Sequence, residues 1–149
     1  MGYKQGSYVL GETIYELRVG DSACIEKIFD REDAYHFGLI TKDMNPVYIN
    51  DVFAEKSWFG KIIMQGSLVS RLISAVIRTK LPGFGCIYKS KTLDFLIPVF
   101  VGDRIYAKVT VIEKKEEKNR CKLKTICFNQ PGETVIDGYA VVIPRSNDL

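Results

Sequence analysis

The segment at residues 41–51, TKDMNPVYIND, brings together side chains that could perform acid–base chemistry. Asp43 carries a carboxylate that can accept a proton, and Tyr48 carries a phenol, which has an ordinary pKa of about 10 and donates hydrogen bonds at neutral pH. Asn45 and Pro46 are typical of a turn, in which Asp43 and Asn45 would only cap a helix and shape the loop. The segment is therefore either a turn or the acid–base loop of an active site.

Gly66 is a second candidate, because it stands immediately before a helical stripe at residues 67–79. Apolar residues in that stripe recur at spacings of one, three and four, and LPGFG at 81–85 ends the helix. The first N–H groups of a helix have no intrahelical acceptor and favour anions. The backbone N–H of Gly66 could thus hold an anionic oxygen.

Composition excludes several function classes. The 149 residues are 46% hydrophobic and 26% charged, which predicts one domain over residues 1–149 with a short N-terminal tail at about 1–12. The net charge of +3 gives no reason to expect a nucleic-acid partner. Four cysteines without a Cys-x-x-Cys pair and a single histidine, His36, predict no metal site, and a reduced, cytoplasmic protein is expected. Charged residues within 1–20 argue against a signal peptide, and no apolar run is long enough to span a membrane.

The remaining pattern predicts an α+β fold. A strand at about 23–29 precedes a helix that Asp30 would cap. A short helical piece is then expected to end near residues 59–60. Trp58 and Phe59, at the end of this piece, would be core or dimer contacts. Four later segments are rich in β-branched and aromatic residues and predict an antiparallel sheet. A charged run at 113–119 is expected to be a solvated hairpin tip. Because the helix at 67–79 is the only large amphipathic element, the sheet should wrap around it. Four residues are predicted to share one face of a strand: Ile105, Ala107, Val109 and Val111.

Motifs spread over most of the chain resemble the MaoC-like dehydratases, which include the (R)-specific enoyl-CoA hydratases and have the hot-dog fold. Their number, order and spacing carry the resemblance. They are VGD at 19–21, DAYHFGLITKDMNPVY at 33–48, FGKIIMQGSL at 59–68, LPGFG at 81–85, FLIPVFVGD at 95–103 and NQPGETVIDGYAVV at 129–142.

The resemblance implies roles for individual residues. The family loop Asp-x-Asn-Pro-x-His corresponds to Asp43, Asn45, Pro46 and Tyr48, so a tyrosine stands where the histidine of the catalytic dyad is expected. A family His-Gly pair corresponds to Gln65 and Gly66, whose N–H would bind the thioester oxygen. Ser74 corresponds to a pocket-lining serine. The implied catalytic residues are Asp43, Gly66 and Tyr48, and the implied substrate-binding residues are Asn45, Gln65 and Ser74.

Three activities fit this assignment. The first is hydration of a trans-2-enoyl-CoA, in which a partly buried Asp43 with a raised pKa would be the sole base and Tyr48 a donor. The second is a non-catalytic module that binds acyl-CoA, and the third is thioester hydrolysis. Coenzyme A would enter only as part of the substrate, with no further cofactor, and Lys89 and Lys91 could meet its phosphates or only water. By resemblance, and because an exposed sheet edge seeks a partner, at least a homodimer is expected.

Overall fold

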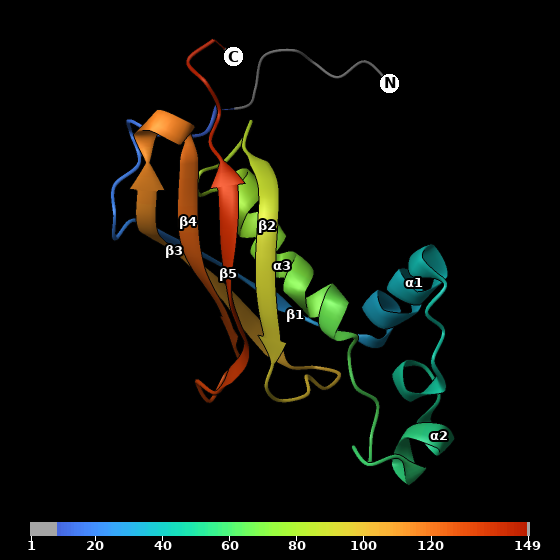
Figure 1. Ribbon diagram of the computed structural model, residues 1–149. Helices are drawn as coiled ribbons and strands as arrows, with labels where there is room; N and C mark the ends of the chain where they lie inside the picture. Colours follow the sequence, from blue (N-terminus) through green and yellow to red (C-terminus); the bar gives the residue numbers. More distant parts are fainter. Residues whose placement is uncertain (1–8, 149) are drawn as a thin grey trace.

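A five-stranded antiparallel sheet forms the body of the protein, as seen in a computed structural model that describes residues 9–148 (Figure 1). The sheet order is β1-β3-β4-β5-β2, and every neighbouring pair is antiparallel. The predicted strands are all present, with bounds that differ slightly from the expected ones. They are β1 (Ser22–Ile28), β2 (Ile87–Phe95), β3 (Arg104–Lys115), β4 (Arg120–Phe128) and β5 (Thr134–Ile143).

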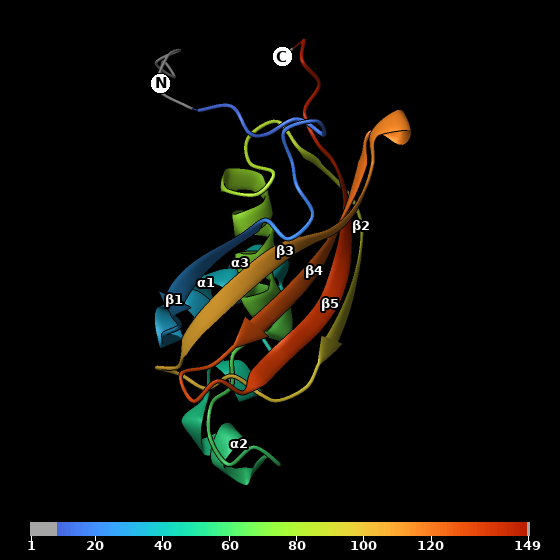
Figure 2. The same cartoon turned by 90° about the vertical axis from the view of Figure 1, so that its left-hand side faces the viewer.

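Helix α3 (Gly66–Thr79) lies against one face of this sheet, as the amphipathic pattern predicts (Figure 2). It contacts β1, β3 and β4. The predicted common face of Ile105, Ala107, Val109 and Val111 on β3 is confirmed, and it is the buried face, since each of the four is fully buried. The apolar face of α3 meets them through Val69, Leu72, Ile73, Val76 and Ile77. Burial of these apolar surfaces is the main favourable term that holds helix and sheet together.

Three of the four cysteines pack in the core. Cys86, Cys121 and Cys127 are free and buried, and Cys24 is free and exposed. Burial raises the pKa of Cys121 to about 11 and that of Cys127 to about 12, so both remain protonated thiols at neutral pH.

Strand β2 is at the edge of the sheet, beside β5, although it precedes β3 in the chain. Residues 96–103 must therefore cross the end of the sheet from one side to the other. The backbone of Leu96 donates to Val135 at 2.9 Å, and Val99 accepts from Met64 at 2.7 Å. This crossing loop is thus fastened to β5 and to the segment that enters α3.

The chain between β1 and α3 projects from the sheet, at the right of Figure 1. It contains α1 (Arg31–Thr41), the 3-10 turn η1 (Pro46–Tyr48) and α2 (Asp51–Lys56). Asp30 caps α1 as predicted, in a reciprocal capping box with Asp33. The prediction for α2 is wrong at its end, because the helix stops at Lys56 and Ser57 takes an extended backbone conformation.

The aromatic pair after α2 does not belong to the core of the chain. Trp58 is 99% exposed and Phe59 is 41% exposed. A core role for them is therefore wrong, and the alternative of a dimer contact stays a prediction.

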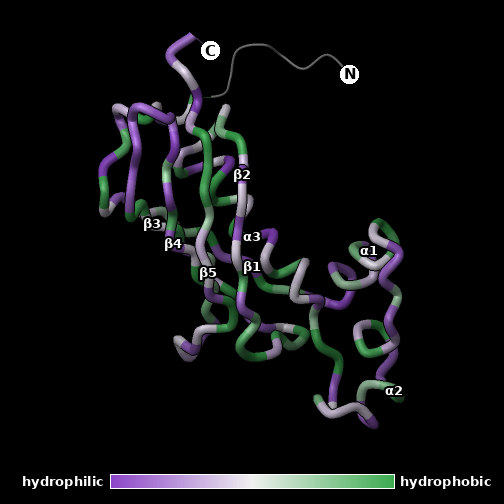
Figure 3. Tube along the Cα trace, in the orientation of Figure 1, coloured by the Kyte–Doolittle hydropathy of each residue, from purple (hydrophilic) through white to green (hydrophobic). Residues whose placement is uncertain are grey.

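The β3–β4 hairpin ends in the short 3-10 turn η2 (Glu116–Lys118), whose residues are exposed. The hydrophilic colouring of this end of the sheet in Figure 3 agrees with the predicted solvated tip. At the N-terminus, Gly11 and Glu12 donate to the backbone oxygens of Phe84 and Pro82 at 3.0 and 2.8 Å. Residues 1–8 of the predicted tail lie outside the described part of the chain. Within residues 9–148, no helix has the length and apolar character to cross a membrane.

Candidate active site

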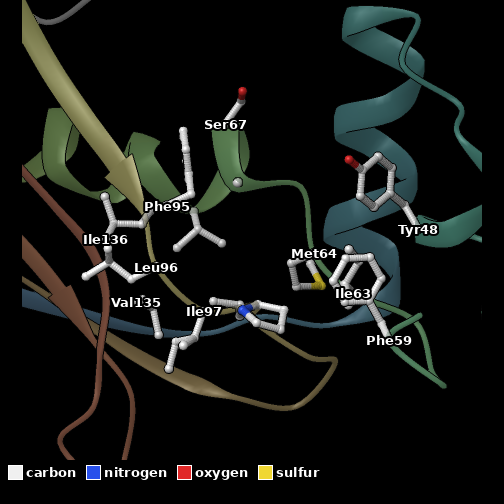
Figure 4. A pocket seen from close by; sticks show the side chains of 14 residues that line it. Tyr48, Phe59, Ile63, Met64, Ser67, Phe95, Leu96, Ile97, Val135 and Ile136 are labelled. Carbon is white, nitrogen blue, oxygen red and sulfur yellow. The ribbon is translucent and has the colours of Figure 1, made fainter. Parts of the chain in front are cut away.

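An apolar cavity of about 480 Å³ opens where the crossing loop, the start of α3 and η1 meet (Figure 4). Its walls are mostly aliphatic and aromatic, which suits an acyl chain and keeps water away from a reacting group. The close-up shows Tyr48 and Phe59 on one side of the cavity and the crossing loop on another. The lining residues are Tyr48, Phe59, Ile63, Met64, Gly66, Ser67, Val69, Phe95, Leu96, Ile97, Pro98, Val99, Val135 and Ile136.

Gly66 is the first residue of α3 and lines this cavity. In that position its N–H has no intrahelical acceptor, and the positive end of the helix dipole adds to its attraction for an anion. A Cβ atom at Gly66 would lie 2.7 Å from Cε1 of Phe95, so any other residue at this position would require the Phe95 ring to move. The structure therefore places a free backbone donor inside an apolar cavity, as the sequence predicts.

Gln65 is buried at 2% exposure and faces α1. Its Nε2 donates to the backbone oxygen of Ala34 at 2.9 Å, while its Oε1 is buried without a hydrogen-bond partner among the described residues. Gln65 is not one of the cavity residues. Its contact joins the projecting segment to the start of α3, which supports a positioning role, and the expected substrate contact of Gln65 stays a prediction.

The loop that follows α1 is shaped by its own backbone and side chains. Lys42 ends the helix in the left-handed region, with φ at 66°. Asn45 Oδ1 accepts from the Val47 N–H at 3.3 Å and so caps η1, which supports the loop-shaping interpretation of Asn45. A Cβ atom at Gly38 would lie 2.9 Å from the backbone oxygen of Asp43, so α1 and this loop approach closely because Gly38 has no side chain.

Asp43 lies near Tyr48 but is exposed, so the expectation of a partly buried carboxylate is wrong for the single chain. The physical reason is that the loop projects from the sheet on α1 and η1, and the described residues place no layer above it. Asp43 is not itself one of the cavity residues. It acts on the cavity through its charge on Tyr48.

Tyr48 is half-buried, and its side chain enters the cavity. Burial raises the pKa of Tyr48, and the negative charge of Asp43 raises it further. Its phenol is consequently neutral at physiological pH and can donate a hydrogen bond, but it cannot replace an imidazole as a base. Tyr48 and Gly66 thus place two hydrogen-bond donors in one cavity, with the carboxylate of Asp43 close to the first.

Ser74 is not brought to this cavity. It lies farther along α3, in a separate hollow with residues of β2 that include Lys89 and Lys91. His36 is exposed on α1, where its ring lies 6.2 Å from that of Tyr35. Among residues 9–148, no group of three His, Cys, Asp or Glu side chains is arranged to hold a metal ion.

Sequence reasoning missed the apolar walls. Phe95, Leu96 and Ile97 line the cavity because β2 ends at the sheet edge and the chain then crosses to β3. No periodicity within this segment predicts that the chain crosses the end of the sheet there. The crossing follows from the sheet order, in which β2 and β3 are not neighbours.

Comparison with known proteins decides the family. The family model described as a MaoC like domain matches residues 15–127. This chain belongs to the MaoC-like family. The 3-hydroxybutyryl-CoA dehydratase of Methylorubrum extorquens is 38% identical over 134 residues, covering 89% of this chain and 85% of that protein. The (R)-specific enoyl-CoA hydratase of Aeromonas caviae is 36% identical over 126 residues, covering 85% of this chain and 94% of the relative.

The fold of this MaoC-like chain agrees with a solved member. The unliganded R-hydratase PhaJ1 of Pseudomonas aeruginosa superimposes with a TM-score of 0.88 at 36% identity, covering 92% of this chain and 88% of that chain. The predicted hot-dog fold, an antiparallel sheet around one central helix, is therefore confirmed.

Proposed function

We propose that this protein is an (R)-specific enoyl-CoA hydratase, which also runs in reverse as a 3-hydroxyacyl-CoA dehydratase. The observation that carries the proposal is the free N–H of Gly66 at the start of α3, in the same apolar cavity as Tyr48 and near Asp43. The names of the relatives at 36–38% identity support the same chemistry. The apolar walls suit the acyl chain of such a substrate.

In the proposed reaction the thioester oxygen accepts the Gly66 N–H, which stabilises the negative charge that develops there. Asp43 takes a proton from water, the resulting hydroxide bonds to the β-carbon, and the carbon–carbon double bond shifts its electrons toward the thioester. Asp43 then returns the proton to the α-carbon, so the site ends as it began. Tyr48 donates a hydrogen bond that orients the water. A bound acyl thioester would cover the exposed Asp43 and remove part of its hydration.

Binding without catalysis is the second candidate, and one observation favours it. Neither position 48 nor position 65 carries an imidazole, and the only histidine, His36, lies on the surface of α1. Loss of one acid–base group costs typically about 10² to 10⁴ in rate. Such a loss weakens a hydratase without requiring that activity vanish, so the hydratase remains the main proposal.

The proposal is tested by mixing the protein with crotonyl-CoA and following the absorbance of the conjugated thioester. Consumption of the substrate with formation of 3-hydroxybutyryl-CoA is the expected result. Release of free coenzyme A without that product would identify a thioesterase instead. Binding of crotonyl-CoA without any turnover would identify a binding module.

Replacement of Tyr48 by Phe is expected to lower kcat/KM by about fivefold, the typical worth of one hydrogen bond of roughly 1 kcal/mol. Because burial and Asp43 raise the pKa of Tyr48 above its ordinary value of about 10, its hydroxyl stays protonated below that pH. In a steady-state assay, the pH–rate profiles of wild type and Tyr48→Phe should therefore have the same shape between pH 6 and pH 9. Tyr15→Phe, which changes an exposed tyrosine, is the control. A limb of the profile that disappears in Tyr48→Phe would mean that Tyr48 ionises in the reaction.

We further propose a cytoplasmic homodimer that uses no cofactor beyond the coenzyme A of its substrate. Strand β2 is an unpaired sheet edge, and Ile87 and Phe95 on it are 59% and 56% exposed. Pairing of two β2 edges would satisfy these backbone groups and cover apolar surface. Sedimentation equilibrium should give twice the chain mass of 16.9 kDa.

A further inference from the structure

The polar side chains that line the apolar cavity are two hydroxyl groups, and neither acts as a base at neutral pH. They belong to Tyr48 and Ser67, and the Gly66 N–H at the start of α3 adds a backbone donor. None of the described residues around the cavity carries a charge, an imidazole or a thiol. Removal of a proton from a bound substrate thus falls to a group beside the cavity.

Asp43 provides a carboxylate beside the cavity. Burial raises the pKa of Tyr48 and the negative charge of Asp43 raises it further, so the carboxylate lies near the phenol that enters the cavity. The Tyr48 hydroxyl is directed toward the start of α3, where Ser67 lies (Figure 4). The chain offers no imidazole here, because its only histidine, His36, is exposed on α1. The site therefore combines one proton acceptor at its edge with two neutral donors inside it, the Tyr48 hydroxyl and the Gly66 N–H.

One carboxylate and two neutral donors suit a reaction that moves a proton within the substrate. Removal of a proton next to a thioester carbonyl puts negative charge on the carbonyl oxygen, and preorganised donors stabilise that charge. Ketosteroid isomerase shifts a carbon–carbon double bond with such a set, an aspartate base and neutral donors at the oxygen that include a tyrosine. Hydration requires in addition that a water molecule be activated. A shift of a double bond is therefore the less demanding reaction for this site.

We propose that this site also isomerises 3-enoyl thioesters to trans-2-enoyl thioesters, an activity that rests on the acyl-thioester cavity of the proposed function. Asp43 takes a proton from the α-carbon, and the electron pair of that C–H bond passes to the thioester oxygen to give a dienolate. The Tyr48 hydroxyl and the Gly66 N–H donate to this oxygen. As the electrons return from the oxygen, a double bond forms between the α- and β-carbons, and the former β,γ pair takes the proton from Asp43 at the γ-carbon. Substrate and product are isomers, so no water or co-reactant is consumed.

The walls of the cavity and the proposed hydration both fit this isomerisation. Apolar side chains, among them Met64, Phe95 and Ile97, keep water away from the dienolate. The α- and γ-carbons are separated by a single atom, so the two oxygens of one carboxylate can serve both. The product of the isomerisation is the substrate of the proposed hydration, so an acyl chain whose double bond starts at carbon 3 needs no second protein.

The test mixes the full chain with 3-butenoyl-CoA, whose double bond is not conjugated with the thioester, and separates the thioesters by chromatography. Wild type should form crotonyl-CoA and then 3-hydroxybutyryl-CoA, neither of which should form without the protein. With crotonyl-CoA in deuterium oxide, NMR should find deuterium in the γ-methyl group, because the exposed Asp43 exchanges its proton with the solvent. Hydration and its reversal place deuterium only on the α-carbon.

The variant Tyr48→Phe distinguishes the two reactions, because Tyr48 donates to water in hydration and to the thioester oxygen in isomerisation. Loss of one donor to such an oxygen costs about 10² to 10³ in kcat. Isomerisation of 3-butenoyl-CoA should therefore fall by about a hundredfold or more, while hydration of crotonyl-CoA falls only about fivefold. An unchanged melting temperature shows that the variant is folded. Tyr15→Phe, which changes an exposed tyrosine, should keep both rates, and Asp43→Asn should lose both.

Failure of this inference is distinguishable from failure of the proposed function. Unchanged 3-butenoyl-CoA, with a wild type that hydrates crotonyl-CoA, overturns the inference and leaves the hydratase proposal intact. Crotonyl-CoA that forms from 3-butenoyl-CoA and then accumulates supports the isomerase while the hydratase proposal fails. Isomerisation that Asp43→Asn retains, or that Tyr48→Phe lowers no more than about fivefold, also overturns the inference, because the proposed base or oxygen donor would then be wrong.

Discussion

Replacement of Asp43 by Asn is expected to lower kcat for hydration of crotonyl-CoA by about 10² to 10⁴, the usual cost of removing a general base. The substitution keeps the size and shape of the side chain, and it removes both the negative charge and the ability to take a proton from water. The described residues offer no histidine close to Tyr48 to take over that role, since the only one in the chain, His36, is exposed on α1. The melting temperature should barely change, because Asp43 is exposed.

Glu55→Gln is the matched control for Asp43→Asn, because it neutralises one exposed carboxylate on the neighbouring α2. It should retain wild-type kcat and KM. Activity of Asp43→Asn within threefold of wild type would remove Asp43 from the mechanism and would return residues 43–48 to the turn interpretation.

Replacement of Gly66 by Ala is expected to lower kcat/KM by about a hundredfold. The new Cβ atom would lie 2.7 Å from Cε1 and 2.8 Å from Cδ1 of Phe95. Either the Phe95 ring moves, or the methyl group occupies the space that the thioester oxygen needs. A displacement of roughly 1 Å at a reacting group costs on the order of 10² in rate. Phe95 is 56% exposed and can swing outward, so thermal unfolding should show little loss of stability.

The double variant Gly66→Ala/Phe95→Ala separates the two causes. If the methyl group blocks close approach of the thioester to the N–H, the loss persists when the ring is removed. Recovery of activity in the double variant would show that Gly66 serves only to make room for Phe95. Phe95→Ala alone is the control for the apolar wall.

Local signals in the sequence predicted the fold well where a single element carries them. The stripe of α3, the capping Asp30 and the alternation of β3 at Ile105, Ala107 and Val109 were each readable from neighbouring residues, and each is confirmed. The glycine before α3 was readable for the same reason, since a helix start and its free N–H are local properties.

Features that depend on contacts between distant segments were not readable. The edge position of β2 follows from its pairing with β5, and the cavity walls at 95–99 follow from the crossing that this pairing requires. The hollow that Ser74 shares with Lys89 and Lys91 is formed by α3 and β2 together, which no pattern within either segment predicts. The exposure of Asp43 follows from a projecting segment whose direction no local pattern encodes.

One measurement tests the central claim most directly: hydration of crotonyl-CoA by wild type and by Tyr48→His, followed side by side through the absorbance of the conjugated thioester and through the products. An active hydratase in which Asp43 is the base and Tyr48 a neutral donor should convert crotonyl-CoA to 3-hydroxybutyryl-CoA in the wild-type reaction, without release of free coenzyme A. A wild type that leaves crotonyl-CoA unchanged, while Tyr48→His hydrates it, would contradict the claim and identify the chain as a MaoC-like module that binds acyl-CoA without catalysis.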